Sequence, residues 1–398
     1  MSKILEIGGV KLSTAASNSR YKRRDDSLII VIDESATISG KFTKNKFKAS
    51  PIKIAEQHIK NRSKEKRVFI VNAGIANAGT GKKGKADALL CCENVANLFK
   101  IKKESVIPFS TGVIGEFLDT KKQIKAFQNA SKNLKSYTWN KAASSILTTD
   151  TKPKLVSKLI KFGNKEIKIK GFAKGSGMIR PDFATLLSFV FTDAKISKTL
   201  LDKIHAEILE ESFEAITVDG DTSPNDSSML VATGQKEVTI TKGTKEEKKL
   251  RSSLHRVYKD LASMLIQDAE GATKEISIQV LQARSKKQAR SVAFTVAESP
   301  LVKTALFGND ANWGRILAAI GRAKGIQNVF NVSISLNKLP LVCKGNIDPK
   351  YSEKSINKIV KSKNLTIKIS IGEGKEKFSV LTSDLSSDYV KINSKYRS

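Results

Sequence analysis

Histidine, cysteine and long apolar runs are all scarce in this sequence, and each shortage excludes a class of protein. The only histidines are His58, His205 and His255, and each lies in a helix-like stretch with no serine or cysteine motif beside it. We expect packing or surface roles for all three. Their absence from any motif argues against a Ser-His-Asp triad and removes the commonest metal ligand.

Cysteine is equally sparse. Cys91 and Cys92 are adjacent in a helix-like stretch and Cys343 lies far away, which is neither a disulfide framework nor a zinc spacing. Reduced core thiols are expected. No apolar run approaches the roughly 20 residues that span a bilayer, and the first residues show no signal-peptide pattern. These patterns predict a cytoplasmic protein with no membrane partner.

The composition is strongly basic, with a formal net charge of +31. Such a charge could bind nucleic acid, because lysine and arginine neutralise phosphates. However, the lysines are spread along the whole chain and aromatic residues make up only 6%, too few for interleaved base-stacking platforms. We therefore expect no nucleic-acid partner and a solvated, lysine-rich surface that attracts small anionic metabolites.

The hydrophobic pattern predicts a mixed α/β (α+β layered) fold, in which mixed sheets are sandwiched with helices and strands do not alternate regularly with helices. Predicted strands cover residues 27–33, 67–74, 275–281 and 331–337. Hairpins are predicted around residues 163–164 and 372–374. Predicted helices cover 88–99, 196–216 and 251–269, and the charged stretch 241–253 is expected to be an exposed turn.

A glycine-rich stretch, AGTGKKGK at 78–85, superficially suggests a phosphate-binding loop. The motif requires a glycine where this chain has Ala76 and a serine or threonine where it has Lys83. The match fails. A turn between a strand and a helix that lines a ligand site with backbone N–H groups remains open.

The segment AKGSGMIRPDFATLLSFVFTDA, at 173–194, resembles the ornithine acetyltransferase family, also called glutamate N-acetyltransferase. Further stretches resemble the family's signatures in the family's order, and together they span nearly the whole chain. They are STGVIGE (110–116), LTTDTKPK (147–154), ITVDGDTSPND (216–226), QDAEGATK (267–274), FGNDANWGRILAAIG (307–321) and YVKINSKYRS (389–398). The chain departs from the usual pattern at Ile75, Phe183 and Pro224, none of which carries the chemistry.

The resemblance implies that the chain cuts itself between Ala184 and Thr185. The products would be an α subunit, residues 1–184, and a β subunit, residues 185–398, which together form one interdigitated catalytic unit and pair into an α2β2 heterotetramer. It also implies the fold of this family and of DmpA aminopeptidases, which resembles but is distinct from that of Ntn hydrolases.

In such a family Thr185 is both the new chain terminus and the nucleophile. Threonine is a weak nucleophile and needs a base within hydrogen-bond reach. A free α-amine, with a pKa of about 7.7–8.0, supplies that base only after the peptide bond is cut. Self-cleavage is therefore an activation step, and it accounts for acyl transfer without a histidine.

The remaining site residues also follow from the resemblance. Thr111 and Gly112 would form the oxyanion hole, since a hydroxyl and a backbone N–H are suitable donors. The substrate-binding positions would be Thr148, Lys174, Thr185, Glu270, Asn393 and Ser398. Lys174 suits a substrate carboxylate and Glu270 suits an ammonium group, and the C-terminus is expected to be ordered and to close the site.

The implied reaction is a double displacement, in which the acetyl group of N-acetyl-L-ornithine passes to Thr185 and then to L-glutamate. No metal or redox cofactor is implied. Some members of the family also use acetyl-CoA as a donor, and the residues leave open whether this chain does. The alternative within the same architecture is a self-processing aminopeptidase or amidase, in which water takes the acyl group.

Overall fold

The computed structural model describes residues 6–61, 64–180, 186–236 and 238–395. These residues form two compact units. Among the described residues, the N-terminal unit comprises those within 6–214 and 222–265, and the C-terminal unit comprises those within 215–221 and 266–395. Each unit has a core of its own.

Two sheets form the centre of the N-terminal unit. The first has the order β1 (Val10–Ala15), β2 (Ser27–Ile32), β4 (Arg67–Ile75), β5 (Val106–Val113). The second has the order β3 (Thr37–Phe42), β11 (Ser227–Ala232), β8 (Leu187–Thr192), β7 (Lys165–Lys174), β6 (Lys154–Phe162). A short parallel pair, β9 (Lys195–Ile196) and β12 (Thr239–Ile240), completes the strands of this unit among the described residues.

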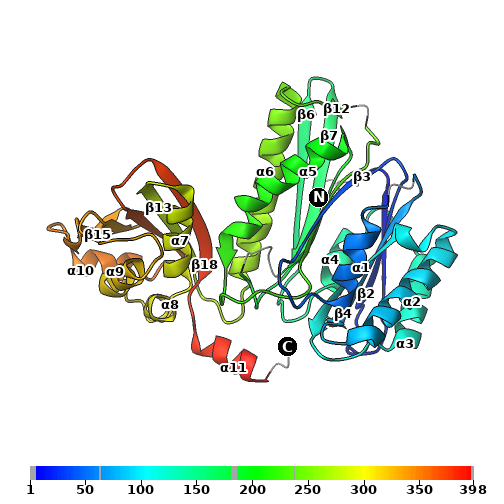
Figure 1. The fold of residues 1–398 in the computed structure, drawn as a ribbon, viewed down its shortest axis with the longest axis horizontal. Coiled ribbons are helices and arrows are strands. Elements are labelled where there is room, and N and C mark those ends of the chain that lie inside the picture. Colours follow the sequence, from blue (N-terminus) through cyan, green and yellow to red (C-terminus); the bar gives the residue numbers. More distant parts are fainter. Residues whose placement is uncertain (1–5, 62–63, 181–185, 237, 396–398) are drawn as a thin grey trace. The chain divides into compact units, whose positions relative to one another are not determined.

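Helices flank these sheets. They are α1 (Ser50–His58), α2 (Gly81–Phe99), α3 (Thr120–Ser131), α4 (Trp139–Ser145), α5 (Lys198–Glu210) and α6 (Lys245–Gln267), with short 3-10 turns η1 (Lys103–Ser105) and η2 (Phe213–Ala215). Figure 1 shows α2 and α3 on one side of β2 and β4, and α5 and α6 beside β6 and β7.

The alternation of side chains along β2 explains this layering. Successive strand residues point to opposite faces, and every residue of β2 is buried. Leu28 and Ile30 join the cluster that includes Phe189 of the second sheet, whereas Ile29 and Val31 join the cluster under α2 and α3. The first sheet is therefore buried on both faces, and the unit is a helix–sheet–sheet–helix sandwich.

The second sheet is covered on its outer side by α5 and α6. His205 on α5 is fully buried and its two ring nitrogens lie 3.0 Å from the hydroxyls of Ser39 and Ser228. Its ring also packs 5.8 Å from that of Tyr258 on α6. Burial lowers the pKa of His205 to about 3, and this histidine is a neutral packing residue, as expected.

One prediction at α6 is partly wrong. The stretch 241–253 was expected to be a turn, but only its first residues are, because α6 begins at Lys245. The hydroxyl of Thr244 accepts a hydrogen bond from the N–H of Glu247 (3.2 Å), and the Glu247 carboxylate accepts one from the N–H of Gly243 (2.6 Å). These two hydrogen bonds cap the first turn of α6. The many charged residues of this stretch made the start of the helix hard to recognise in the sequence.

A seven-stranded sheet forms the C-terminal unit. Its order is β10 (Ile216–Thr217), β18 (Glu376–Ser383), β13 (Glu275–Ala283), β17 (Asn364–Ser370), β14 (Ser333–Leu336), β15 (Leu339–Cys343), β16 (Asn346–Ile347). The helices of this unit are α7 (Lys286–Ala297), α8 (Pro300–Phe307), α9 (Trp313–Gly321), α10 (Glu353–Ile359) and α11 (Ser387–Lys395). Ile276, Ile278 and Val280, at alternate positions of β13, share the core with α7.

The hairpin predicted around residues 372–374 is wrong. β17 and β18 do follow each other in the chain, but β13 lies between them, parallel to β17 and antiparallel to β18. The connection crosses the end of β13, where the N–H groups of Glu373 and Gly374 both donate to the carbonyl of Gln282. Gly374 is required there, because an added Cβ would lie 2.5 Å from the carbonyl oxygen of Ala283.

The other fold predictions are confirmed. The mixed α/β layered class, all four predicted strands and the hairpin at 163–164 between β6 and β7 are present. The predicted helix 88–99 lies within α2, the predicted helix 196–216 is shorter because α5 ends at Glu210, and the predicted helix 251–269 lies in α6, which ends at Gln267. Cys91 and Cys92 are buried free thiols, and Cys343 is free and half-buried. Division at residue 184 into two subunits stays a prediction.

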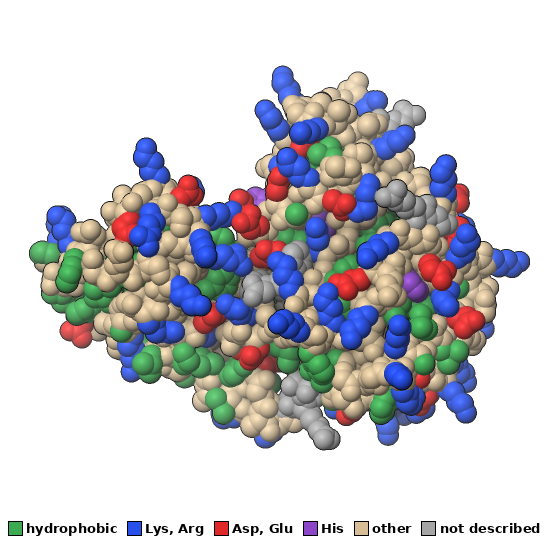
Figure 2. Space-filling model, viewed as in Figure 1, with side chains coloured by type: hydrophobic (Ala, Val, Ile, Leu, Met, Phe, Trp, Pro, Cys, Tyr) green, Lys and Arg blue, Asp and Glu red, His purple; other side chains and the backbone are tan. Residues whose placement is uncertain are grey.

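The basic charge is distributed over the surface. Figure 2 shows Lys and Arg side chains scattered across the viewed face, with Asp and Glu side chains among them. In the part of the chain that the structure describes, no helix is long and apolar enough to cross a membrane.

Lys303 on α8 is a buried cation in the C-terminal unit. Its Nζ donates to the hydroxyl of Thr382 (3.0 Å) and to the carbonyl of Ser383. Burial lowers the pKa of Lys303 to about 8, against the opposing effect of Asp384 and other nearby carboxylates. The folded chain therefore releases this proton at a lower pH than the unfolded chain does.

This predicts a pH dependence of stability. Between about pH 8 and pH 10 the unfolded state binds more protons at this position, so the free energy of unfolding gains up to about 3 kcal/mol as the pH rises. Lys303→Met should lack this gain, whereas Lys361→Met, which changes an exposed lysine, should keep it. Urea unfolding at several pH values measures both. Parallel pH curves for wild type and Lys303→Met would contradict the assignment.

Candidate active site

Lys174 is the centre of a polar cluster in the N-terminal unit. Its Nζ donates to the hydroxyls of Thr148 (2.8 Å) and Thr111 (3.1 Å), and it lies 3.7 Å from Oδ2 of Asp150. The side chain is almost entirely buried. Three residues predicted from separate motifs, Thr111, Thr148 and Lys174, are thus brought together by this unit.

The strand register explains this meeting. Lys174 is the last residue of β7 and lies opposite Leu187, the first residue of β8, which in turn pairs with Ser227 of β11. Thr111 lies near the end of β5 in the other sheet, and Thr148 follows α4. The ends of strands from both sheets therefore contribute to one polar region.

Asp150 holds two lysines at once. Its Oδ1 accepts hydrogen bonds from Nζ of Lys154 (2.6 Å) and from the N–H of Gly175 (2.7 Å), and the side chains of Asp150 and Lys154 are fully buried. Burial by itself would raise the pKa of Asp150, but the charges of Lys174 and Lys154 and the Gly175 N–H lower it to about 2. Asp150 is therefore ionised at neutral pH.

Thr111 and Gly112 lie where β4 and β5 come into unusually close contact. Gly112 has a φ of +131°, and an added Cβ would lie 2.1 Å from the carbonyl carbon of Gly74. Only glycine tolerates both the backbone conformation and this approach. The hydroxyl of Thr111 already contacts the Lys174 ammonium, so a polar donor and a charge are adjacent at this strand end.

The loop that precedes β11 is anchored to the same region. Nδ2 of Asn225 donates to the carbonyls of Ala76 (2.7 Å) and Ser110 (2.9 Å). The carbonyl of Pro224 accepts from the N–H of Ala49 (3.0 Å), so the proline contributes an acceptor where its missing N–H does no harm.

Asp226 follows in this loop and is fully buried. Its Oδ2 has no hydrogen-bond partner among the described residues. Burial raises the pKa of Asp226 well above its ordinary value, and the N–H of Leu186 and the charge of Lys174 offset this only in part. Burial therefore favours the neutral form of Asp226, which lies beside the cluster.

Glu270 and Asn393 belong to the C-terminal unit and contact each other. Nδ2 of Asn393, on α11, donates to Oε2 of Glu270 (2.8 Å) and to the carbonyl of Tyr389 (3.0 Å). The turn after Glu270 packs tightly, because an added Cβ on Gly271 (φ +68°) would lie 2.4 Å from the N atom of Tyr389. The predicted residues thus form two groups, one in each unit.

Ala184, Thr185 and Ser398 lie outside the described residues. Their predicted roles as cleavage site, nucleophile and terminal substrate contact therefore stay predictions. The chain on either side of the predicted cleavage site is described up to Arg180 and from Leu186.

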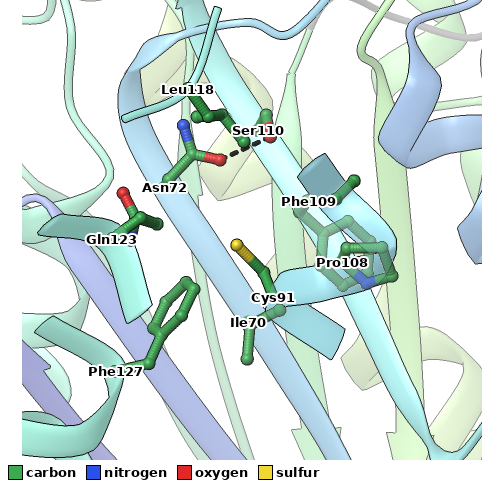
Figure 3. Close-up of a pocket in the computed structure, with 10 residues that line it drawn as sticks. Ile70, Asn72, Cys91, Pro108, Phe109, Ser110, Leu118, Gln123 and Phe127 are labelled. Atoms are coloured by element: carbon green, nitrogen blue, oxygen red, sulfur yellow. Dashed lines mark hydrogen bonds between the residues drawn. The ribbon is translucent and has the colours of Figure 1, made fainter. Parts of the chain in front are cut away.

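Two hollows in the N-terminal unit are separate from this cluster. A cavity of about 10 Å3 lies between β4, β5, α2 and α3, lined by Asn72, Cys91, Ser110 and Gln123 among others, and it has room for about one water molecule. Figure 3 shows Asn72 and Ser110 on its wall. A groove of about 860 Å3 runs beside β3 and the start of α5, and none of the predicted site residues lines it.

Sequence reasoning missed Asp150, Lys154, Asn225 and Asp226 as members of this site. All four lie within the motifs that were identified, but the sequence gives no measure of their burial. The signal that could have found the first two is an acid and a base four residues apart in a stretch without helical periodicity.

Comparison with known proteins identifies the family. The model of the ArgJ family matches residues 11–398. The chain is 42% identical to the arginine biosynthesis bifunctional proteins ArgJ of Methylococcus capsulatus and Psychrobacter arcticus, and each alignment covers 99% of this chain and 97% of the relative. Among solved structures, the ArgJ protein of Bacillus halodurans is 33% identical with a TM-score of 0.49, covering 51% of this chain and 96% of that one. The chain therefore belongs to the ArgJ family of arginine biosynthesis and is an enzyme, an acyltransferase.

Proposed function

We propose that this enzyme transfers the acetyl group of N-acetyl-L-ornithine to L-glutamate through an acetyl-Thr185 intermediate. The observation that carries the proposal is the contact of Lys174 with both Thr111 and Thr148 at the strand ends of the N-terminal unit. A buried ammonium beside two hydroxyls suits an α-carboxylate or a developing oxyanion. Leu186, the residue after Thr185, also lies in this region, since its N–H hydrogen-bonds the Asp226 carboxyl.

Activation by self-cleavage between Ala184 and Thr185 is part of the proposal. The cleaved chain would consist of residues 1–184 and 185–398. β7 precedes this bond and β8 follows it, and the two strands are paired from Ile169↔Thr192 to Lys174↔Leu187. The hydrogen bonds of this ladder would hold the two fragments together after the cut. Pairing into an α2β2 heterotetramer is proposed from the family resemblance alone.

The proposed chemistry needs no cofactor. The neutral α-amine of Thr185 accepts the hydroxyl proton as Oγ attacks the acetyl carbonyl, and Thr111 and Gly112 stabilise the oxyanion. Ornithine leaves with that proton, and the amine of glutamate then attacks the ester and regenerates the hydroxyl. Glu270 and Asn393 of the C-terminal unit, together with Ser398, would bind the amino-acid substrates.

We also propose a cytoplasmic enzyme without a nucleic-acid or membrane partner. The relatives are named bifunctional proteins. Acetylation of glutamate from acetyl-CoA is therefore a candidate second activity of this chain.

The choice of acyl acceptor tests the proposed function. With N-acetyl-L-ornithine as donor, the purified enzyme should release ornithine rapidly only when L-glutamate is present, and equimolar N-acetylglutamate should form. Mass spectrometry or coupled assay of both products measures this. Ornithine release at the same rate without glutamate would identify a hydrolase instead.

Thr185→Ala tests the cleavage step. The variant lacks the attacking hydroxyl, so it should remain one full-length chain with no transferase activity, whereas Thr185→Ser should still cleave and retain partial activity. Intact-mass measurement resolves the full-length chain from the two fragments. A Thr185→Ala chain cut between residues 184 and 185 would remove Thr185 from self-cleavage.

Lys174→Met tests the buried cation. Loss of a charge-assisted contact to substrate should lower kcat/KM by roughly 10- to 100-fold. The matched control is Lys170→Met on the same strand, since Lys170 is also buried but stacks 5.1 Å over the ring of Trp139 and lies outside the cluster. Steady-state kinetics of both variants decides the question. Equal losses in the two would indicate a general effect on β7.

A further inference from the structure

Asn225 connects the loop before β11 to the ends of β4 and β5. Both partners of its amide group, the carbonyls of Ala76 and Ser110, are acceptors, so the nitrogen and not the oxygen must point at them. The side chain is buried, at 6% exposure. It uses both N–H groups of one amide to bridge two adjacent parallel strands.

The bond to Ser110 acts directly on Thr111. The carbonyl of Ser110 and the N–H of Thr111 belong to one planar peptide unit, so fixing the carbonyl direction fixes where the backbone enters Thr111. The next residue is Gly112, which has a φ of +131°. Because glycine has no Cβ, its backbone rotates more freely than that of other residues. Contacts from outside the β4–β5 ladder therefore add to the pairing that holds this strand end.

The anchor on the opposite side is Asn72 of β4. Its Oδ1 accepts the hydroxyl of Ser110, and its Nδ2 donates to the carbonyl of Ile75 (2.7 Å). Figure 3 shows the Asn72 amide oxygen directed at that hydroxyl. Asn72 therefore holds the side chain of Ser110 from within the first sheet, and Asn225 holds its carbonyl from a loop of the second.

The loop that carries Asn225 is itself fixed. Nδ2 of Asn45 donates to the carbonyl (2.9 Å) and hydroxyl (3.1 Å) of Thr222, and the hydroxyl of Thr43 donates to the carbonyl of Ser223 (2.8 Å). The N–H of Thr43 donates to the carbonyl of Asp226 (3.0 Å). These contacts hold the Asn225 side chain in a defined position relative to Ser110.

We propose that Asn225 is a positioning residue for acyl transfer, which sets the Ser110–Thr111 peptide, and with it the oxyanion donors, in register with the strand that follows Thr185. The register arises because Ser227, two residues after Asn225, pairs with Leu187, two residues after Thr185. The inference rests on the proposed function. Residues 110 and 225 lie on opposite sides of the proposed cleavage site, so this contact would join the two fragments.

Asn225→Ala removes both donors, and it should lower kcat about 100-fold with KM changed by less than about threefold, because misplaced donors destabilise the transition state more than the bound substrate. Asn225→Ser, which keeps one hydroxyl donor, should recover part of the loss. It also carries the test if the alanine variant does not fold. Rates are normalised to the fraction of cleaved chain found by intact mass.

The matched control is Asn45→Ala, which removes two anchors of the same loop without touching Ser110. We expect its kcat to be unchanged. A loss equal to that of Asn225→Ala would show that loop anchoring in general matters, and it would overturn the specific role of Asn225.

A double-mutant cycle with Thr111→Val distinguishes a failure of the Asn225 proposal from a failure of the proposed function. If Asn225 acts through Thr111, the double variant should be little slower than the slower single variant. Losses that multiply would overturn the Asn225 proposal alone. A wild-type kcat in Thr111→Val would remove the oxyanion assignment, and the Asn225 proposal with it.

Discussion

The polar end of the N-terminal unit depends on one buried carboxylate shared by two lysines. Taking Asp150, Lys154 and Lys174 out of water costs several kcal/mol per ion, and only their mutual attraction and added hydrogen bonds offset that cost. Loss of Asp150 would leave the fully buried Lys154 without its anion. Lys174 donates to both Thr111 and Thr148, so the carboxylate that pairs with Lys174 lies at the centre of the candidate active site.

The second sheet places a further constraint on any cut between residues 184 and 185. β8 is flanked by β7, which comes before the bond, and by β11, which comes after it. A break there severs a connection between paired strands but leaves the ladders in place. Cleavage would then expose a new amine without disrupting the strand pairing around it. The contact of Asn225 with Ser110 is one of several further links between the two parts of the chain, together with the pairing of β3 and β11.

Local patterns in the sequence were reliable where residues close together in the chain decide the structure. The run of β-branched residues along β2 and the glycine turn between β6 and β7 gave correct strands, because those signals depend on neighbours in the chain. The pairing of β17 with β18 was wrong, because a strand about a hundred residues earlier in the sequence inserts between them and no local signal reports that. Likewise, nothing in the spacing of Asp150 and Lys154 reveals that both are fully buried.

The effect of a charge also depends on burial, which the sequence does not report. The surface carries most of the +31 net charge, yet exposed charges farther apart than about 10 Å are largely screened by salt. The charges of Asp150, Lys154 and Lys174 are buried, so salt screens them far less and they act at short range. Burial raises the pKa of Asp226 and so opposes the addition of a second negative charge beside Lys174. The burial of Asp226 therefore bears on the charge that a substrate carboxylate would meet in the proposed site.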